Sequence, residues 1–366
     1  RVDPMAQFRQ QQAEAKREMV EEQARRSYEN DLIAIEEGAG PAHLRDRNFW
    51  MQYSRGGLTI AEDPSTATVR ALNEAGRAAL TRNVGDLTKT ADYFDHRGFS
   101  AVDAERLDWA SVGVNFDAIA ETMQALADNG LPPVYVMMFD EAWRFIEGLF
   151  EIVGPILRDE GLELESSLYG WALEVPELDA KKGEKIGQNF GVPHRDLSYT
   201  DSHMADGASS IISVWVPIRD ATLDNGCMYV VPREHDPLFA AVEDRAHLAP
   251  HTERFPWQYA RALPAKQGSV LSWHPNTIHW GSGCTTYADE PRKSIAMAFR
   301  VPQSRQPMPE KDLRSQRRLP FTKAEIQNGL SLHERVVFCT RCVYLYKVWH
   351  PTFDGLNKEK LGFGLN

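Results

Sequence analysis

The sequence predicts an α+β protein, with a helical N-terminal half followed by a β-core of the antiparallel sandwich or jelly-roll type. Up to about residue 165, apolar residues recur at helical spacing, whereas beyond it short apolar runs alternate with Gly, Pro and Asp-Asn turns. Short strands separated by such turns are typical of sandwiches and jelly rolls. We therefore expect a mostly helical region over 1–165 that packs on a core over 166–305, with a C-terminal extension over 306–366.

Amphipathic patterns place the helices of the N-terminal half. In the segment that begins at Asp117, Ile119, Met123 and Leu126 fall on one helical face, and Gly130 follows as a stop signal. A polar stretch near the N-terminus, rich in Gln, Glu, Ala, Arg and Lys, indicates a solvated helix. The predicted helices span about 7–37, 65–81, 117–128 and 140–157.

Five strand-like runs define the predicted β-core. Along one of them Ser213 and Trp215 alternate with Ile212, Val214 and Val216, which is the pattern of a strand with two different faces. The runs span about 168–175, 209–217, 228–231, 269–273 and 294–301.

Composition and charge exclude several classes of protein. The chain has 366 residues, 42% hydrophobic and 25% charged, which is typical of a globular protein with a sizeable core. Its net charge of −11 opposes phosphate backbones, so nucleic acid is not an expected partner. No apolar run approaches the roughly 18 residues that cross a bilayer, so no membrane association is expected.

Cysteine usage indicates a reducing compartment. The four cysteines do not form a disulfide framework, and the polar N-terminal stretch has no apolar segment typical of secretion. We therefore expect a cytoplasmic location. Cys339 and Cys342 form a lone CxxC without the second ligand pair that zinc needs, and we interpret them as two packed thiols.

The segment around His194 carries the chemistry. In an extended chain, residues two apart project to the same side, so His194 and Asp196 offer an imidazole and a carboxylate to one point. A second histidine from a later strand would complete a set of two His and one carboxylate, which suits non-haem Fe(II) and leaves coordination positions open. His274 and His279 both follow a predicted strand, and we favour His279 because Pro275 disrupts strand pairing beside His274.

These residues, together with Ser213–Pro217 (SVWVP), 224–235 (DNGCMYVVPREH) and His279–Gly283 (HWGSG), resemble the phytanoyl-CoA dioxygenase family. The resemblance covers about 169–301 and implies a double-stranded β-helix core of the cupin-like jelly-roll type. It also implies Fe(II), 2-oxoglutarate and O2, with His194, Asp196 and His279 as both metal ligands and catalytic centre. A small-molecule metabolite would be hydroxylated, desaturated or cyclised while succinate and CO2 are released.

The resemblance further implies an arginine after the distal histidine that binds the far carboxylate of 2-oxoglutarate. Arg292 fits this position, and its planar fork suits a carboxylate. Ser294 lies two residues on, on the same strand face, and Ser213 is a third expected cosubstrate contact by the same resemblance. The spacing from His279 is about two residues longer than the family pattern, so Arg300 is kept as the alternative.

The same residues leave other functions open. A non-catalytic β-sandwich that binds a metal or ligand is the main alternative, and a cupin with different metal chemistry would not need Arg292. His194–Leu197 (HRDL) also matches the start of a protein-kinase catalytic loop, but a phosphate loop and the other kinase motifs are absent from the sequence. Related halogenases carry a small residue where Asp196 stands, so oxygen insertion or desaturation is expected rather than chlorination.

Overall fold

The computed structural model describes residues 30, 33–37, 41–63, 74–173, 192–248, 250, 255–302, 304–305 and 320–346. The helix predicted over 7–37 and the first half of that predicted over 65–81 lie largely outside these residues. Within them, none of the helices is both long and apolar enough to cross a membrane.

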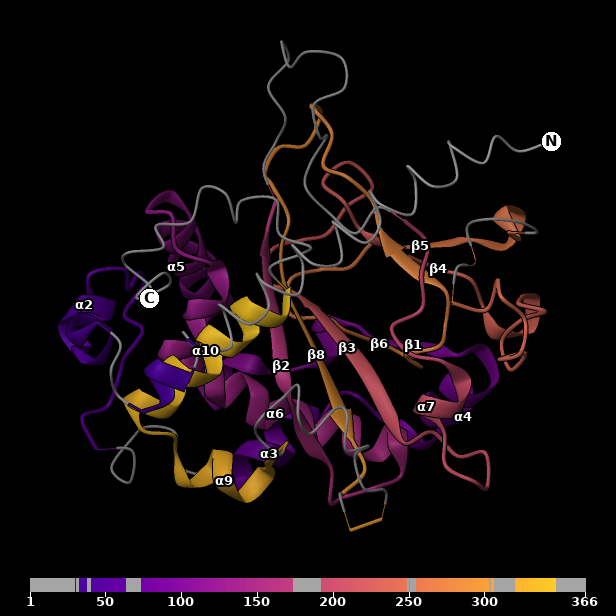
Figure 1. Cartoon of the computed structure of the whole chain (residues 1–366), viewed down its shortest axis with the longest axis horizontal. Coiled ribbons are helices and arrows are strands. Elements are labelled where there is room, and N and C mark those ends of the chain that lie inside the picture. The colour runs from indigo at the N-terminus through magenta and orange to yellow at the C-terminus, as the bar shows by residue number, and fades with distance from the viewer. Residues whose placement is uncertain are drawn as a thin grey trace, which may run out of the picture.

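Two antiparallel sheets form the centre of the molecule (Figure 1). The larger sheet has six strands in the order β1-β6-β3-β8-β2-β9, and the smaller has three in the order β5-β4-β7. The larger sheet contains β1 (Phe99–Val102), β2 (Glu163–Ala172), β3 (Ile211–Pro217), β6 (Val270–Trp273), β8 (Lys293–Arg300) and β9 (Phe321–Thr322). The smaller sheet contains β4 (Met228–Val230), β5 (Arg261–Leu263) and β7 (His279–Gly281).

Most of the helices lie on the left in Figure 1, whereas α4 and α7 lie on the right near β1. Their ends follow local capping chemistry: the Asn115 side chain accepts hydrogen bonds from the backbone N–H groups of Asp117 and Ala118 at the start of α5, and Gly98, at φ +82°, ends α4. The helices are α2 (Arg47–Met51), α3 (Glu74–Thr81), α4 (Leu87–Arg97), α5 (Phe116–Asp128), α6 (Asp140–Leu157), α7 (Tyr199–Ser202), α9 (Lys323–Asn328) and α10 (Leu332–Tyr346). Short 3₁₀ turns cover Ala42–Arg45, Ala104–Arg106, Trp109–Val112, Pro133–Met138, Arg233–His235 and Trp257–Tyr259.

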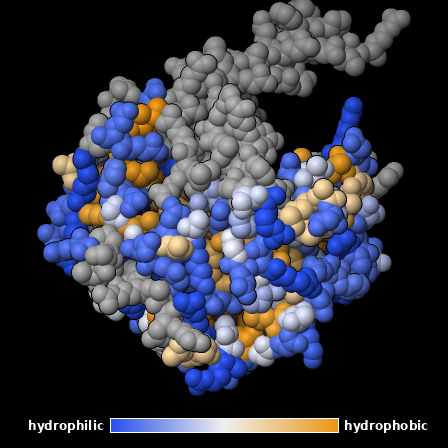
Figure 2. Space-filling model, turned by 90° about the horizontal axis from the view of Figure 1, so that it is seen from below, coloured by the Kyte–Doolittle hydropathy of each residue, from blue (hydrophilic) through white to orange (hydrophobic). Residues whose placement is uncertain are grey.

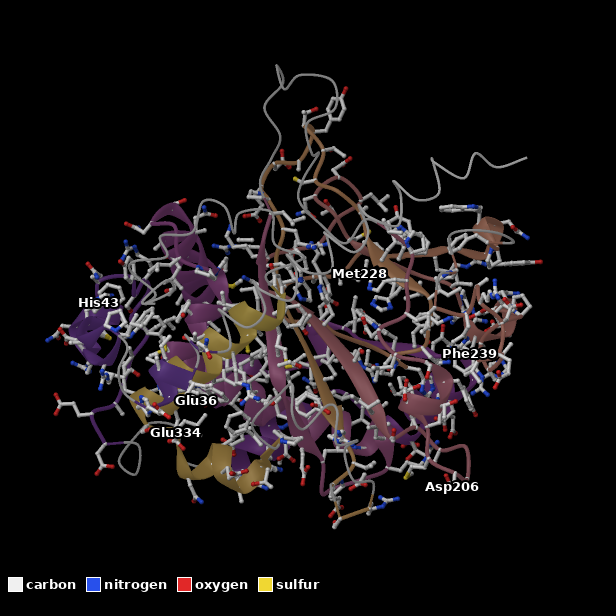
Figure 3. The ribbon with its side chains drawn as sticks, viewed as in Figure 1. Glu36, His43, Asp206, Met228, Phe239 and Glu334 are labelled. Atoms are coloured by element: carbon white, nitrogen blue, oxygen red, sulfur yellow. The ribbon has the colours of Figure 1, made fainter. Side chains whose placement is uncertain are left out.

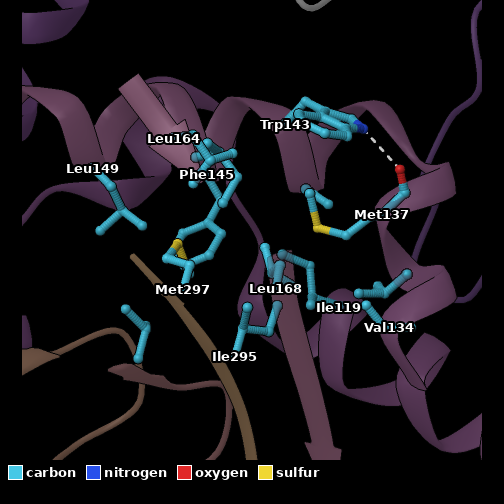
Figure 4. Close-up of a cluster of buried hydrophobic side chains, with 14 of the residues drawn as sticks. Ile119, Val134, Met137, Trp143, Phe145, Leu149, Leu164, Leu168, Ile295 and Met297 are labelled. Atoms are coloured by element: carbon cyan, nitrogen blue, oxygen red, sulfur yellow. Dashed lines mark hydrogen bonds between the residues drawn. The ribbon is translucent and has the colours of Figure 1, made fainter. Parts of the chain in front are cut away.

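The main hydrophobic core lies between these helices and the larger sheet (Figure 4). Ile295, Met297 and Phe299 alternate along β8 and all belong to this core. Phe299 makes an edge-to-face contact with Phe150 of α6, with ring centroids 4.8 Å apart. Burying side chains of this size removes large apolar areas from water, so this face carries much of the stability of the fold.

The opposite face of the larger sheet looks toward the smaller sheet. Trp215 of β3, Leu271 and Trp273 of β6 form a second cluster with Met228 and Val230 of β4. Figure 3 shows Met228 on the side of the molecule away from the helices. The space between the two sheets is therefore separate from the helix-packed core.

The predicted elements are present wherever the structure describes them, with ends that shift by a few residues. Helices α5 and α6 match their predicted ranges closely, and β2 begins at Glu163 rather than about residue 168. Several elements had no counterpart among the predictions: strands β1, β5, β7 and β9 and helices α2, α4, α7, α9 and α10. Because β1 pairs with β6, the N-terminal half supplies an edge strand to the larger sheet as well as helices.

The C-terminal extension packs onto the same body. A capping box of Thr322 and Glu325 starts α9, and α10 lies against β2. Near the start of α10, the His333 ring lies 3.2 Å from the carbonyl oxygen of Glu36, so both end regions meet there (Figure 3). Cys339 and Cys342 are buried free thiols on α10, which confirms their interpretation as packing residues. From the side shown in Figure 2, the described surface is mostly hydrophilic with small hydrophobic areas.

Candidate metal centre

A short extended segment brings two predicted ligands to β7. The backbone N–H of His194 donates to the carbonyl of His279 at 3.1 Å, and the N–H of His279 donates back to His194 at 3.0 Å. Two residues on, the N–H of Asp196 donates to the carbonyl of Pro275 at 2.8 Å. This antiparallel bridge fixes the segment against the strand that carries the third residue.

The three side chains converge at one point. One ligand atom each from His194, Asp196 and His279 lies within 4.8 Å of the others. The Nε2 atoms of His194 and His279 lie 3.6 and 3.5 Å from the same oxygen, Oδ1 of Asp196. Two imidazoles and one carboxylate in this arrangement form the donor set of a facial two-His-one-carboxylate iron site.

Backbone carbonyls fix which nitrogen of each ring faces the centre. Nδ1 of His194 lies 2.8 Å from the carbonyl of Val192, and Nδ1 of His279 lies 3.0 Å from that of Thr277. A carbonyl only accepts, so each Nδ1 must carry the proton. Each Nε2 therefore presents its lone pair to the centre, as second-sphere hydrogen bonds do in known histidine metal sites.

The electrostatics favour a charged carboxylate beside a neutral imidazole. Burial lowers the pKa of His279 to about 4, so this ring is neutral at neutral pH. Desolvation raises the pKa of Asp196, but the two histidines and a hydrogen bond from Ser213 outweigh it and hold the pKa well below its usual range. Burial also lowers the pKa of His194, but the Asp196 carboxylate more than offsets this and raises it. An ionised carboxylate and a neutral imidazole are the forms that bind a metal.

Ser213 and Trp273 complete the surroundings of the three residues. The Ser213 hydroxyl of β3 donates to Oδ2 of Asp196 at 2.9 Å, which leaves Oδ1 facing the two histidines. The resemblance implied a cosubstrate contact for Ser213, whereas the geometry gives it a carboxylate-orienting contact. Trp273 of β6 lies with its ring centroid 4.7 Å from that of His279. Both residues come from the sheet face opposite the helix-packed core.

The structure brings His279, and not His274, to the centre. Nδ1 of His274 lies 2.8 Å from the Ser209 hydroxyl, and its ring packs against Phe94 at 4.1 Å and His203 at 5.2 Å. Burial holds the pKa of His274 well below its usual value. His274 is thus a neutral packing residue beneath the turn that leads to β7.

Arg292 is a buried cation between the sheets. It is 1% exposed, its guanidinium lies 5.5 Å from the Trp215 ring centroid, and Nη1 donates to the carbonyl of Gly226. Burial lowers its pKa to about 10, so it stays charged at neutral pH. Gly226 has φ +103°, and a Cβ there would meet the Ser282 carbonyl at 2.6 Å, which explains the glycine of the Asp-Asn-Gly turn.

Ser294 adds a buried polar group near this arginine. It is fully buried, and its hydroxyl has no hydrogen-bond partner among the residues that the structure describes. The indole N–H of Trp273 is also buried and has no hydrogen-bond partner among these residues. Unsatisfied buried polar groups are rare in folded proteins, so groups of this kind are candidates for contacts with a bound molecule.

Three other basic residues of the β-core form ion pairs with carboxylates away from the candidate centre. Arg300 pairs with Glu165 at 3.1 Å, and Lys266 pairs with Asp220 at 2.7 Å. Arg219 pairs with Asp117. These contacts give the three cations partners within the protein.

Arg233 and three aromatic residues of the β-core, Tyr199, Trp273 and Trp280, lie in different surroundings. The Arg233 guanidinium lies 4.7 Å from the Phe239 ring centroid, and its Nη1 donates to the carbonyl of Asp95 in α4 at 3.0 Å. Trp280 stacks on Tyr229 on the outer side of the smaller sheet, and Tyr199 stacks on His203. Trp273 instead lies beside the candidate centre, where its ring contacts that of His279.

Sequence reasoning missed the contribution of the C-terminal helix. Tyr346, in the last turn of α10, packs edge-to-face on Tyr169 with centroids 4.7 Å apart. Tyr169 in turn contacts Trp171 at 4.0 Å, and both lie in a cluster with Cys284. No local pattern signals this, because α10 reaches the sheet only through the tertiary fold.

Comparison with solved structures finds distant similarity. The epimerase SnoN, in complex with Fe3+, alpha ketoglutarate and nogalamycin RO, is 16% identical with a TM-score of 0.42, covering 59% of this chain and 83% of its own. The non-heme monooxygenase ThoJ in its apo form is 18% identical with a TM-score of 0.41, covering 58% and 78%. EctD from S. alaskensis, with 2-oxoglutarate and 5-hydroxyectoine, is 16% identical with a TM-score of 0.37, covering 70% and 91%.

The family assignment rests on a family model. The model described as "Phytanoyl-CoA dioxygenase (PhyH)" matches residues 53–294, which is more than half of the chain and includes all three residues of the candidate metal centre. The match confirms the resemblance drawn from the sequence motifs. The chain therefore belongs to the phytanoyl-CoA dioxygenase family and is an oxygenase of the class that depends on Fe(II), 2-oxoglutarate and O2.

Proposed function

We propose that this protein oxidises a small-molecule metabolite by hydroxylation, desaturation or cyclisation, with His194, Asp196 and His279 as the iron ligands. The observation that carries the proposal is the pair of Nδ1–carbonyl contacts, which turn both Nε2 lone pairs toward one carboxylate oxygen. The donor set fits Fe(II): two imidazoles, one hard oxygen ligand and coordination positions left for other molecules.

Each residue around the centre has a separate task in this proposal. Bound iron, with 2-oxoglutarate and O2, supplies the oxidation of the substrate. Val192 and Thr277 hold the two rings through their carbonyls, and Ser213 holds the free oxygen of Asp196. Asp196 occupies the carboxylate position, which favours oxygen insertion or desaturation over chlorination.

Arg292 and Ser294 are proposed to bind 2-oxoglutarate. A guanidinium that is buried and still charged at neutral pH attracts a carboxylate strongly. The Ser294 hydroxyl, which has no partner within the described ranges, adds a donor on the same strand face. Ser213 is kept as the third proposed contact, although its hydroxyl already donates to Asp196.

The remaining predictions complete the proposal. Strands β2 to β8 are proposed to form the double-stranded β-helix predicted over about 166–305, with 1–165 packed on it and 306–366 as an extension, while β1 and β9 join the larger sheet from these flanking regions. A cytoplasmic location and the absence of nucleic-acid and membrane partners stay predictions from composition and cysteine usage.

The test is succinate release from 2-oxoglutarate, measured with and without Fe(II) while a metabolite library is screened. Turnover that requires both iron and one class of substrate supports the proposal, and product mass then distinguishes a gained oxygen atom from a loss of two hydrogens. Tight metal binding with no 2-oxoglutarate turnover on any library member would favour the non-catalytic binding protein instead. A chlorinated product in chloride buffer would contradict the role given to Asp196.

A further inference from the structure

Arg195 stands between two proposed iron ligands in the sequence, but its side chain points away from them. The side chain is 0% exposed and forms a two-pronged ion pair with Asp236, whose side chain is 3% exposed. Nη1 donates to Oδ2 at 2.6 Å and Nη2 donates to Oδ1 at 3.0 Å. A planar fork is the geometry that such a bidentate pair requires.

The same guanidinium also binds two backbone carbonyls from different loops. Nε donates to the carbonyl of His247 at 2.6 Å, and Nη1 donates to that of Asn276. Asn276 lies in the turn between β6 and β7, three residues before His279. Arg195 therefore ties the segment that carries His194 and Asp196 to the turn that carries His279.

Two of the residues that Arg195 binds make further hydrogen bonds of their own. Oδ1 of Asp236 accepts from the N–H of Leu238 at 3.0 Å, and the Asn276 side chain donates to the carbonyl of Phe239 at 2.8 Å. The turn is also held by the end of α4, because the Thr277 hydroxyl donates to the carbonyl of Gly98 at 2.8 Å. These hydrogen bonds form a frame that joins the His194–Asp196 segment to the turn before β7. Phe239, which is part of it, is labelled in Figure 3.

We infer that the Arg195–Asp236 ion pair is a positioning device that sets the spacing between the two halves of the metal centre. Arg195 acts through the backbone and contacts no proposed ligand atom. The inference rests on the proposed function, because it assigns the frame a role in metal binding rather than in stability alone. A lysine keeps the charge but cannot bridge two carboxylate oxygens and two carbonyls at once, so the spacing depends on arginine.

The experiment compares Arg195→Lys with a matched control, Arg335→Lys. Arg335 is also buried and binds one carboxylate, Asp140 at 2.6 Å, and two carbonyls, those of Leu330 and Met138, but it lies on α10. We measure Co(II) affinity by titration, the Co(II) absorption spectrum and the melting temperature. Arg195→Lys should weaken Co(II) binding about tenfold and change the spectrum, as loss of outer-shell support does elsewhere. Arg335→Lys should lower the melting temperature and leave affinity and spectrum unchanged.

A second variant covers the case in which Arg195→Lys does not fold. Arg195→Met combined with Asp236→Leu replaces the buried pair by apolar residues, a change that is often neutral or stabilising. This double variant leaves no buried charge without a partner, so it should fold, with a melting temperature lowered by the lost hydrogen bonds to His247, Asn276 and Leu238. It should still show the weaker Co(II) binding and altered spectrum. Wild-type affinity and spectrum in the double variant, or equal losses in the Arg195 and Arg335 variants, would overturn the inference. Failure of the wild-type protein to bind Co(II) would instead contradict the proposed function.

Discussion

The two faces of the larger sheet differ in what their side chains do. On the helix side, β3 and β8 present Val214, Ile295 and Phe299, and every one is buried in one continuous apolar core. On the opposite side, neighbouring positions of the same strands present Ser213, whose hydroxyl donates to the Asp196 carboxylate, and Ser294, whose buried hydroxyl has no partner in the described part of the chain.

Within β3 and β8, residues on one face therefore stabilise the fold, and residues on the other face belong to the candidate site. A fully buried apolar face stabilises the fold by removing area from water, and it tolerates no polar group without a partner. The other face meets a buried cation, Arg292, and a carboxylate, Asp196, which belong to the candidate site. Substitutions on the two faces should therefore change different quantities, and the predictions below test this.

The largest effect is expected at the metal centre. His279→Ala removes a proposed ligand and should abolish metal binding and Fe(II)-dependent turnover. Metal added to the wild-type protein should raise its melting temperature, because a ligand that binds only the folded state stabilises it, and the variant should lose this shift. His274→Ala is the control: it removes a buried ring, so it should lower stability while metal binding remains. The opposite pattern would assign the ligand role to His274.

On the helix side, Phe299→Ala should lower the free energy of unfolding by about 3–5 kcal/mol, because it leaves a cavity against Phe150. Denaturant unfolding measures this loss. The dissociation constant for Co(II) in the folded protein should stay unchanged. A loss of metal affinity in this variant would show that the two faces are coupled and would contradict their separate roles.

Arg292→Ala should weaken 2-oxoglutarate binding by about 2–5 kcal/mol, since it removes a buried charge-assisted partner of a carboxylate. Titration of the metal-loaded protein with 2-oxoglutarate under anaerobic conditions measures this change, and metal affinity should persist. Arg300→Ala is the matched control, because Arg300 is also buried on β8 but pairs with Glu165. Loss of 2-oxoglutarate affinity in the Arg300 variant alone would move the cosubstrate role to that residue.

The smallest effect is expected for Ser213→Ala. The variant loses one hydrogen bond to the Asp196 carboxylate, and metal affinity should fall by about 1 kcal/mol, a roughly fivefold change. Ser213→Thr keeps the hydroxyl and should retain wild-type affinity. Unchanged Co(II) titration curves for both variants would show that Asp196 is oriented without this contact.

Patterns local in sequence predicted much of the molecule. The spacing of Ile119, Met123 and Leu126 defined α5, and the alternation along 211–217 separated the two faces of β3. The same-side geometry of His194 and Asp196 needed only the period of an extended chain. Strand β1 was not predicted, because the formation of a short edge strand depends on pairing with β6, which lies far away in the sequence.

The sequence by itself determined the residue types of the metal centre and, through its motif order, the family. The sequence favoured His279 over His274, but only the tertiary structure shows which ring lies beside His194 and Asp196, because this depends on the antiparallel bridge between His194 and His279. The tertiary structure likewise assigned Arg195 to Asp236 and Arg300 to Glu165, since a charged side chain carries no local signal of its distant partner. Local periodicity fixes where a side chain points along its own element, whereas the partner it meets is fixed by how elements pack.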